Sequence, residues 1–192
     1  MTEYVVVYPY PVDCPTKRIP LILKDKPLYL KGMLNLPGGK LDTGERVIGA
    51  AVRELKEETG LEEIQEYDPM CYCPPEKLGV IQGANGGKEF TIYCVRVPIS
   101  SRQDLNPRLT EIENVDWYDL PGLLNLPNLM PNLRLVIPLM EKGVSGWVIQ
   151  DFNDNWRDTA YHKIVLTFNG IEDNPLKISV RSCAYYLLEE EE

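Results

Sequence analysis

The sequence has little histidine, an odd number of cysteines and a shortage of positive charge. His162 is the single histidine in 192 residues, and we expect it to lie outside the core, so histidine-centred catalysis is not expected. Five cysteines cannot all pair within one chain, which favours a reducing, cytoplasmic environment. Lysine and arginine number 20 against 29 for aspartate and glutamate, a formal net charge of -9. This acidity argues against nucleic acid or an anionic membrane as a partner.

Long hydrophobic runs are also missing. A membrane-spanning helix needs about 20 apolar residues, and the run near the N-terminus, "YVVVY", is short and follows no basic leader. We therefore expect neither membrane insertion nor secretion. Cys71 and Cys73 have no second pair at metal-ligand spacing, so we expect burial there rather than zinc. The remaining composition, 44% hydrophobic and 26% charged, is that of a soluble globular protein.

The residue pattern predicts strands and helices over most of the chain. Residues 3–10 and 89–99 are rich in β-branched and aromatic residues, which favours strands, and residues 19–23 form a second apolar run. Residues 82–89, "QGANGGKE", are interpreted as a flexible loop. Helical periodicity covers residues 47–59, which end at Gly60, and a segment from Asn132 that follows Pro131.

From Gly146 the chain becomes rich in strand signals. The segments "GWVIQDFN", "AYHKIVLTFN" and "LKISVRSCAYYLL" are predicted as three strands separated by polar turns. We therefore divide the chain into a core, residues 1–145, and a β-rich C-terminal extension, residues 146–192. Three interpretations of the extension stay open: a homodimer surface, a lid, or a cover for an exposed strand edge.

The helix predicted over residues 47–59 crowds three carboxylates onto one face. At 100° per residue, Glu57 lies about -60° and Glu58 about +40° from Glu54. The apolar positions fall on a different arc, which predicts the face that docks on a sheet: Ile48, Ala51, Val52 and Leu55. A hard divalent cation such as Mg²⁺ would suit the carboxylates. The alternative is a solvated acidic face.

Three further features lie within this helix or just before it. Asp42 to Glu45 resembles a capping box, with an acceptor side chain followed three residues later by glutamate. Arg46 and Arg53, seven residues apart, are placed to hold carboxylates by charge-assisted hydrogen bonds. The preceding "PGGK" bends the backbone and can aim the Gly38 carbonyl at the same ion.

The spacing around these glutamates resembles the signature of the Nudix hydrolases, G-x5-E-x7-R-E-U-x-E-E-x-G-U, in which U is a bulky aliphatic residue. Every specified position is filled: Gly39, Glu45, Arg53, Glu54, Leu55, Glu57, Glu58, Gly60 and Leu61. The flanking "LPGGK" and "TEIENVDWYDLPGLL" are also similar to family members. Residues from 146 onward resemble nothing in the family.

The resemblance implies an α/β fold, the Nudix α/β/α sandwich with a mixed β-sheet. It also implies metal-dependent hydrolysis of a nucleoside diphosphate linked to another moiety. The implied ligands for Mg²⁺ or Mn²⁺ are Glu54, Glu57, Glu58 and the Gly38 carbonyl. Glu45 would support the site, and Arg53 would orient its glutamates.

The residue that removes the proton from the attacking water is left open by the resemblance. Within the signature we favour Glu57, with Glu54 next. Outside it the candidates are Glu89 and Glu111, which lies six residues before Trp117. A solvated loop glutamate is an equally good interpretation of Glu111.

The substrate is predicted from weaker signals. Candidate contacts are Phe90, Tyr93 and Trp117, which could stack on a base, and Lys88, which could meet a phosphate or a ribose. Core packing is the more ordinary role for the aromatics, and plain exposure for Lys88. The best candidates are ADP-ribose or an NDP-sugar; some ADP-ribose-cleaving members carry a proline about fifteen residues beyond the signature, and Pro74 and Pro75 lie near that position.

Two alternatives to ADP-ribose hydrolysis are retained. Tyr72 keeps dinucleoside polyphosphates open, and nucleoside triphosphates are a related possibility. A non-catalytic nucleotide sensor is an alternative function of a different class. Such sensors usually lose glutamates of the signature, and none is lost in this sequence.

Overall fold

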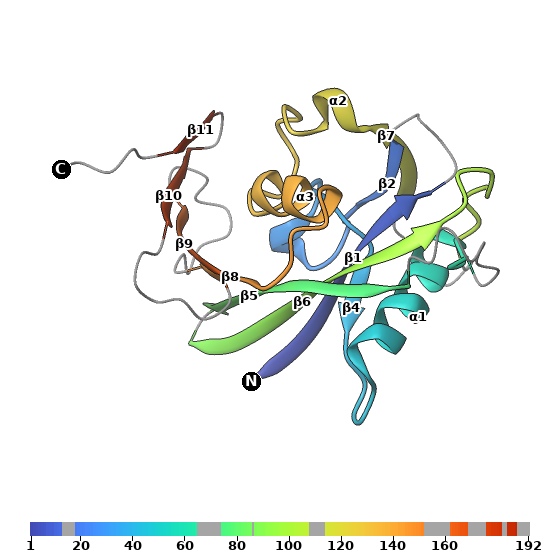
Figure 1. The fold of residues 1–192 in the computed structure, drawn as a ribbon, viewed down its shortest axis with the longest axis horizontal. Coiled ribbons are helices and arrows are strands. Elements are labelled where there is room, and N and C mark those ends of the chain that lie inside the picture. The colour runs from blue at the N-terminus through green and yellow to red at the C-terminus, as the bar shows by residue number, and fades with distance from the viewer. Residues whose placement is uncertain are drawn as a thin grey trace.

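The computed structural model describes residues 1–12, 18–64, 74–85, 87–107, 114–151, 162–168, 176–181 and 184–187. One large sheet organises the fold (Figure 1), with its strands in the order β11-β10-β9-β8-β5-β6-β1-β4. The strands of this sheet are β1 (Thr2–Pro11), β4 (Gly38–Lys40), β5 (Glu76–Asn85), β6 (Lys88–Ile99), β8 (Trp147–Asp151), β9 (His162–Phe168), β10 (Leu176–Arg181) and β11 (Ala184–Leu187).

The large sheet is mixed, as the sequence predicts. Strand β1 runs parallel to β6, and β5 runs parallel to β8. The other neighbours in the sheet are antiparallel. A second, antiparallel sheet contains β3 (Leu34–Asn35), β2 (Arg18–Leu23) and β7 (Asn114–Asp119), in that order. The predicted strands at 3–10 and 89–99 are therefore confirmed, and the apolar run at 19–23 lies in strand β2.

Helices α1 (Val47–Thr59) and α3 (Leu133–Glu141) pack on the two faces of the large sheet (Figure 1). Because side chains alternate along a strand, β1 sends Val5 and Val7 toward α1, and Val6 and Tyr8 toward α3. The short elements η1 (Leu28–Leu30) and α2 (Leu120–Leu123) follow β2 and β7. Helix, sheet and helix form the predicted α/β/α sandwich.

Helix α1 has the predicted bounds and ends at Gly60, whose φ of 76° is left-handed. Its buried apolar residues are Ala50, Ala51 and Leu55, so Ala50 takes the core position assigned to Val52. The predicted capping box does not start the helix, because the N-cap is Arg46 without a side-chain bond. The Glu45 carboxylate still accepts a hydrogen bond from the Asp42 N–H, at 3.1 Å.

The predicted loop at residues 82–89 is wrong over most of its length. Strands β5 and β6 continue through it as a hairpin, with Ala84 opposite Glu89 and Asn85 opposite Lys88. Pairing with β6 extends to the end of β5, and residues 82 and 83 are also paired with β8 on the other side. Long-range sheet pairing here overrides the local preference of glycine for turns.

The C-terminal extension continues the large sheet. The third predicted strand segment contains two strands, β10 and β11, so the extension has four described strands where three were predicted. At Gly79 an added Cβ would collide with the indole of Trp147, so this glycine lets β8 lie against β5. The division at residues 145 and 146 stays a prediction.

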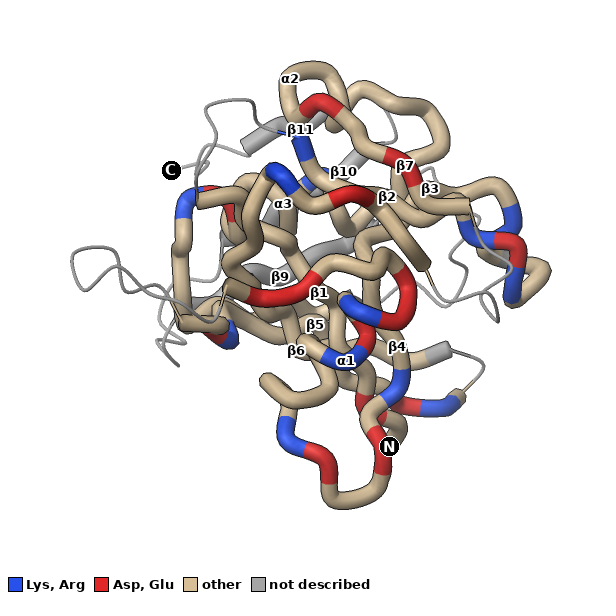
Figure 2. Tube along the Cα trace, turned by 90° about the vertical axis from the view of Figure 1, so that its right-hand side faces the viewer, with Lys and Arg blue, Asp and Glu red and all other residues tan. Residues whose placement is uncertain are grey.

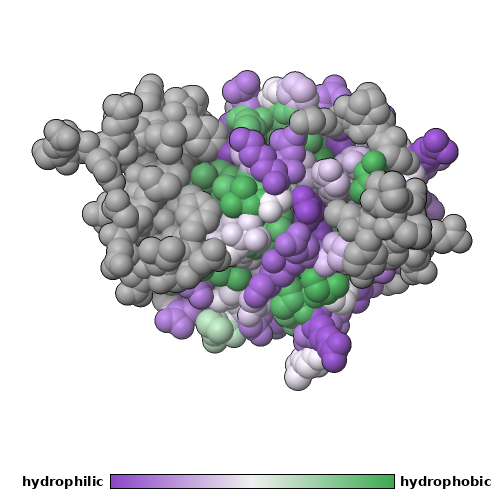
Figure 3. All heavy atoms as spheres, viewed as in Figure 1, coloured by the Kyte–Doolittle hydropathy of each residue, from purple (hydrophilic) through white to green (hydrophobic). Residues whose placement is uncertain are grey.

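Charge and hydropathy are mixed over the surface. Acidic and basic residues are interspersed over the described part of the chain, and both kinds occur on α1 (Figure 2). On the face drawn in Figure 3, hydrophobic residues form separate groups between hydrophilic ones. Within the described ranges, no helix combines the length and the hydrophobicity that crossing a membrane requires.

Candidate functional site

The three glutamates of α1 are largely buried. The side chains of Glu54, Glu57 and Glu58 are 12%, 22% and 10% exposed. A solvated acidic face would leave them mostly in water, so that alternative does not hold. Ionised carboxylates removed from water require cations or N–H donors close by, and each of the three has them.

Arg53 joins most of the acidic residues of the signature into one network. Its Nη1 donates to Glu54 Oε1 at 2.8 Å and to Glu57 Oε2 at 3.0 Å. Its Nε and Nη2 bind the two oxygens of Glu45 at 2.8 and 2.9 Å, a bidentate pair. These bonds lower the pKa of Glu45 to about 2 and raise the pKa of Arg53. The geometry suits the predicted role of Arg53 in orienting its glutamates.

Glu58 is held by a different pair of donors. Its Oε1 accepts a hydrogen bond from Lys24 Nζ at 3.0 Å, and its Oε2 accepts one from the Gly38 N–H at 2.6 Å. Burial nevertheless raises the pKa of Glu58 to about 7, against the lowering by both donors. Burial also raises the pKa of Glu54, despite Arg53. Negative charge at this position is therefore destabilising, and a further cation would relieve it.

Two glycines let the carboxylates approach strand β4. A Cβ on Gly39 would collide with the carboxylate of Glu54. A Cβ on Gly38, whose φ is 154°, would collide with the Val5 carbonyl of the neighbouring strand β1. Strand β4, at the edge of the large sheet, thus packs closely against both the Glu54 carboxylate of α1 and strand β1.

The donor chemistry of this cluster fits a hard divalent cation. Mg²⁺ prefers oxygen ligands and commonly takes one or two carboxylates with waters and phosphate oxygens, and Glu54, Glu57 and Glu58 supply such oxygens. As the side chains stand, no three Asp, Glu, His or Cys residues of the described ranges form a group that could hold a metal ion. Arg53, Lys24 and the Gly38 N–H hold these oxygens instead. The predicted metal ligands, including the Gly38 carbonyl, stay predictions.

A cavity of about 480 Å³ adjoins the carboxylate cluster. Lys24, Gly38 and Gly39 lie in its wall, so the cluster and the cavity share one boundary. The cavity wall also includes Lys88, Glu89, Phe90 and Asn132. Asn132 is only 6% exposed, and its Oδ1 has no hydrogen-bond partner among the described residues. Sequence analysis treated Asn132 only as the start of a helix and did not consider Lys24.

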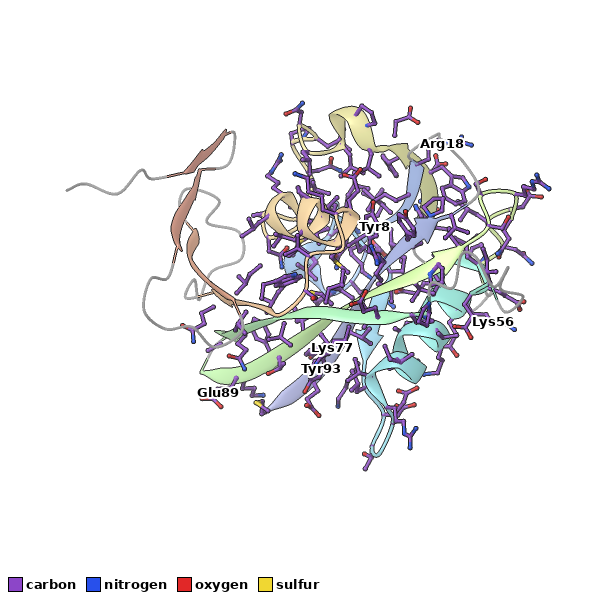
Figure 4. All side chains as sticks on the ribbon, viewed as in Figure 1. Tyr8, Arg18, Lys56, Lys77, Glu89 and Tyr93 are labelled. Carbon is purple, nitrogen blue, oxygen red and sulfur yellow. The ribbon has the colours of Figure 1, made fainter. Side chains whose placement is uncertain are left out.

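The structure separates the four predicted substrate contacts. Phe90 and Lys88 line the cavity. Tyr93 lies on the opposite face of the sheet, because it has the strand parity of Val95 on the α1 side and not that of Phe90. Its hydroxyl donates to Glu3 at 2.6 Å, and its ring lies 5.6 Å from Lys77 Nζ (Figure 4).

Trp117 is also away from the cavity. Its ring lies 5.9 Å from the Arg18 guanidinium and packs against the hydrophobic cluster beneath α1. Of the glutamates considered outside the signature, Glu89 lies in the cavity wall. Glu111 lies outside the described residues, as do Cys71, Tyr72 and Cys73.

The sequence matches the NUDIX domain over residues 17–140. It is 25% identical over 122 residues to Nudix hydrolase 10 of Arabidopsis thaliana, a match that covers 60% of this chain and 41% of that protein. It is 54% identical over 41 residues to the ADP-ribose pyrophosphatase of Methanocaldococcus jannaschii, covering 21% and 24%. The matches thus span less than half the length of these two curated relatives.

Solved structures show the same fold at low sequence identity. The MutT protein of Bacillus halodurans aligns with a TM-score of 0.59 at 16% identity, over 79% of this chain and 90% of that one. The NUDIX domain of Shewanella oneidensis NrtR, complexed with ADP ribose, aligns with a TM-score of 0.57 at 19% identity, over 73% and 86%. The domain match covers more than half of the sequence, and its complete signature lies on α1 and its flanks, so the chain belongs to the Nudix family.

Proposed function

We propose that the protein is a Mg²⁺- or Mn²⁺-dependent pyrophosphohydrolase that cleaves a nucleoside diphosphate linked to a second moiety, with ADP-ribose or an NDP-sugar as the first candidates. The main observation behind this proposal is that the carboxylate cluster and the cavity share one wall. Lys24, Gly38 and Gly39 border the cavity and also contact the glutamates of α1. A diphosphate bound at this wall would place its nucleoside or sugar in the cavity.

The relatives support this choice of substrate. The short match with 54% identity is to a protein named as an ADP-ribose pyrophosphatase, and one protein of the same fold is complexed with ADP ribose. The filled glutamate positions favour catalysis over sensing. Dinucleoside polyphosphates and nucleoside triphosphates carry the same phosphoanhydride and remain the alternatives.

The chemistry assigned to the site is hydrolysis of one phosphoanhydride bond. Water attacks a phosphorus atom, and the bond from that atom to the bridging oxygen breaks. With ADP-ribose the products are AMP and ribose 5-phosphate. A bound divalent cation would neutralise phosphate oxygens and lower the pKa of the attacking water.

The chain's own groups would position and deprotonate that water. We assign proton removal to Glu57, with Glu54 as the alternative, because both carboxylates accept from the same Arg53 Nη1. Arg53 is anchored in turn by Glu45 and by the Lys40 carbonyl, 3.2 Å from its Nη2. This anchoring limits the movement of the two glutamates and so holds the base in reach of the water.

The environment of Asn132 favours a nucleoside as the group that occupies the cavity. A buried acceptor without a donor costs about 1–3 kcal/mol, because its bond to water has been lost. An N–H or O–H of a nucleoside would satisfy the Oδ1 of Asn132. Phe90, in the same wall, offers an aromatic surface for a base.

Replacing Asn132 with leucine tests this contact. We expect KM for the substrate to rise about tenfold, since a satisfied buried hydrogen bond is lost. Leucine also removes the unpaired Oδ1, so the loss of this oxygen should not by itself lower the unfolding free energy. Asn132→Ser retains an uncharged oxygen acceptor and serves as the control. An unchanged KM in the leucine variant would show that the substrate does not bind Asn132.

The function itself is tested by a panel of nucleotides with Mg²⁺ and with Mn²⁺. We expect release of AMP from ADP-ribose that depends on the divalent cation. ATP or ADP as a product would favour dinucleoside polyphosphates, and pyrophosphate would favour nucleoside triphosphates. Binding of nucleotide and metal without turnover of any member would reject the hydrolase in favour of the non-catalytic sensor.

A further inference from the structure

We propose that Lys24 is a resident counter-ion of Glu58, which a divalent cation displaces and which then faces the anionic part of the substrate. This inference rests on the proposed function, since it concerns the same site. It gives one side chain two successive partners, Glu58 before the metal ion binds and the phosphates afterwards.

The position of Lys24 supports its first partner. The residue directly follows strand β2, 34 positions before Glu58 in the sequence, and its Nζ lies 3.0 Å from Glu58 Oε1. The two side chains are 11% and 10% exposed. An ammonium group loses strong hydration when it is buried, so it is stable there only beside a negative group. The fold therefore builds a cation into the glutamate cluster.

The ammonium group of Lys24 lies beside the Glu58 oxygen that a divalent ion would have to bind. A metal ion at Glu58 Oε1 would meet the positive charge of Lys24 and be repelled by it. The other oxygen of Glu58 accepts from the Gly38 N–H, which belongs to the backbone of β4 and is held by pairing with β1. Lys24 has a flexible four-carbon stem. Of the two donors to Glu58, Lys24 is the one that can move.

The cavity supplies the second partner. Lys24 lies in its wall, so a displaced ammonium group remains beside the bound substrate. A compact charge with three rotatable donors suits phosphate oxygens. Metal binding would thus release a phosphate-binding group, and substrate binding would prevent it from returning to Glu58. The two ligands would then strengthen each other's binding through this residue.

Binding of Mn²⁺ to the substrate-free protein tests the exchange. We compare wild type with Lys24→Met, Lys24→Gln and Lys24→Arg, and use Lys31→Met as the control, because Lys31 is 60% exposed and pairs with Asp25. At about pH 8.5, Lys24→Met and Lys24→Gln should bind Mn²⁺ at least about tenfold more tightly, since each leaves the buried carboxylate of Glu58 without its counter-ion. Lys24→Arg and Lys31→Met should stay near wild type.

Kinetics and chemical labelling provide independent measurements. KM for ADP-ribose should rise at least about tenfold in Lys24→Met, and Lys24→Arg should restore it, because only the arginine keeps a phosphate-binding charge. In wild type, reductive methylation of Lys24, followed by mass spectrometry, should accelerate when Mg²⁺ is added and slow again when AMP is also present. This measurement decides the matter if the variants do not fold.

The outcomes separate this inference from the proposed function. If wild type hydrolyses ADP-ribose but Lys24→Met binds Mn²⁺ no more tightly, the role of Lys24 is wrong and the hydrolase stands. Labelling of Lys24 that Mg²⁺ does not change has the same meaning. If no variant binds Mn²⁺ and wild type has no turnover, both the proposed function and this inference fail.

Discussion

Replacing Glu57 or Glu58 with glutamine is expected to reduce turnover of the best substrate at least about 100-fold, while the fold is retained. Glutamine keeps the shape of each side chain and one of its oxygens, but it removes the negative charge that would bind a cation. In Glu58→Gln the remaining oxygen can still accept from the Gly38 N–H. In Glu57→Gln the amide oxygen can still accept the hydrogen bond from Arg53, but it no longer carries a negative charge.

The matched control for these variants is Glu62→Gln. Glu62 follows the signature and is 61% exposed, where it pairs with Lys56 on the surface. We expect the turnover of Glu62→Gln to equal that of wild type, because exposed ion pairs of this kind contribute little to stability. Circular dichroism of all three variants establishes that the fold persists. Unimpaired turnover in both Glu57→Gln and Glu58→Gln would show that the assigned roles are wrong.

Replacing Gly39 with alanine is expected to reduce turnover by a comparable factor, about 100-fold, through displacement of a carboxylate by a fraction of an ångström to an ångström. The new methyl group would occupy the space of the Glu54 carboxylate. Glu54 would have to swing away from β4 and from Arg53, so the cluster would lose one of its predicted ligands. Affinity for Mn²⁺ should fall with turnover.

Gly49→Ala provides the matched control, since it makes the same change on the same helix. An added Cβ at Gly49 meets nothing within 4 Å, and alanine in a helix is more stable than glycine by about 0.5–1 kcal/mol. We therefore expect a modest gain in unfolding free energy and unchanged turnover. A Gly39→Ala variant as active as Gly49→Ala would contradict the position assigned to Glu54.

The parts of the fold that sequence analysis predicted correctly depend on neighbours in the chain. Helix α1 has the predicted bounds because its periodicity and its terminator, Gly60, act within one element. Strand β6 was recognisable from its own β-branched and aromatic residues. The prediction at residues 82–89 is wrong because the two arms of this segment pair with each other as the end of the β5–β6 hairpin, and residues 82 and 83 also pair with β8.

The choice between Phe90 and Tyr93 illustrates a second limit. Both residues were equal candidates from composition, and they lie three apart on one strand, hence on opposite faces of the sheet. Which face borders the cavity depends on where α3 and the end of β2 pack. Only the structure shows that Phe90 is in the cavity wall and that Tyr93 contacts Glu3 and Lys77.

The acidic face of α1 follows from the sequence alone, because the angle between residues of one helix depends only on their spacing. The same spacing brings Arg53 next to Glu57, one turn away. The surroundings of that face follow from tertiary structure. Lys24 reaches Glu58 across 34 residues, and Asn132 borders the same cavity from α3. Such contacts form only when separate segments pack together, so no local sequence pattern predicts them. They place an ammonium group and a cavity beside the glutamates of α1.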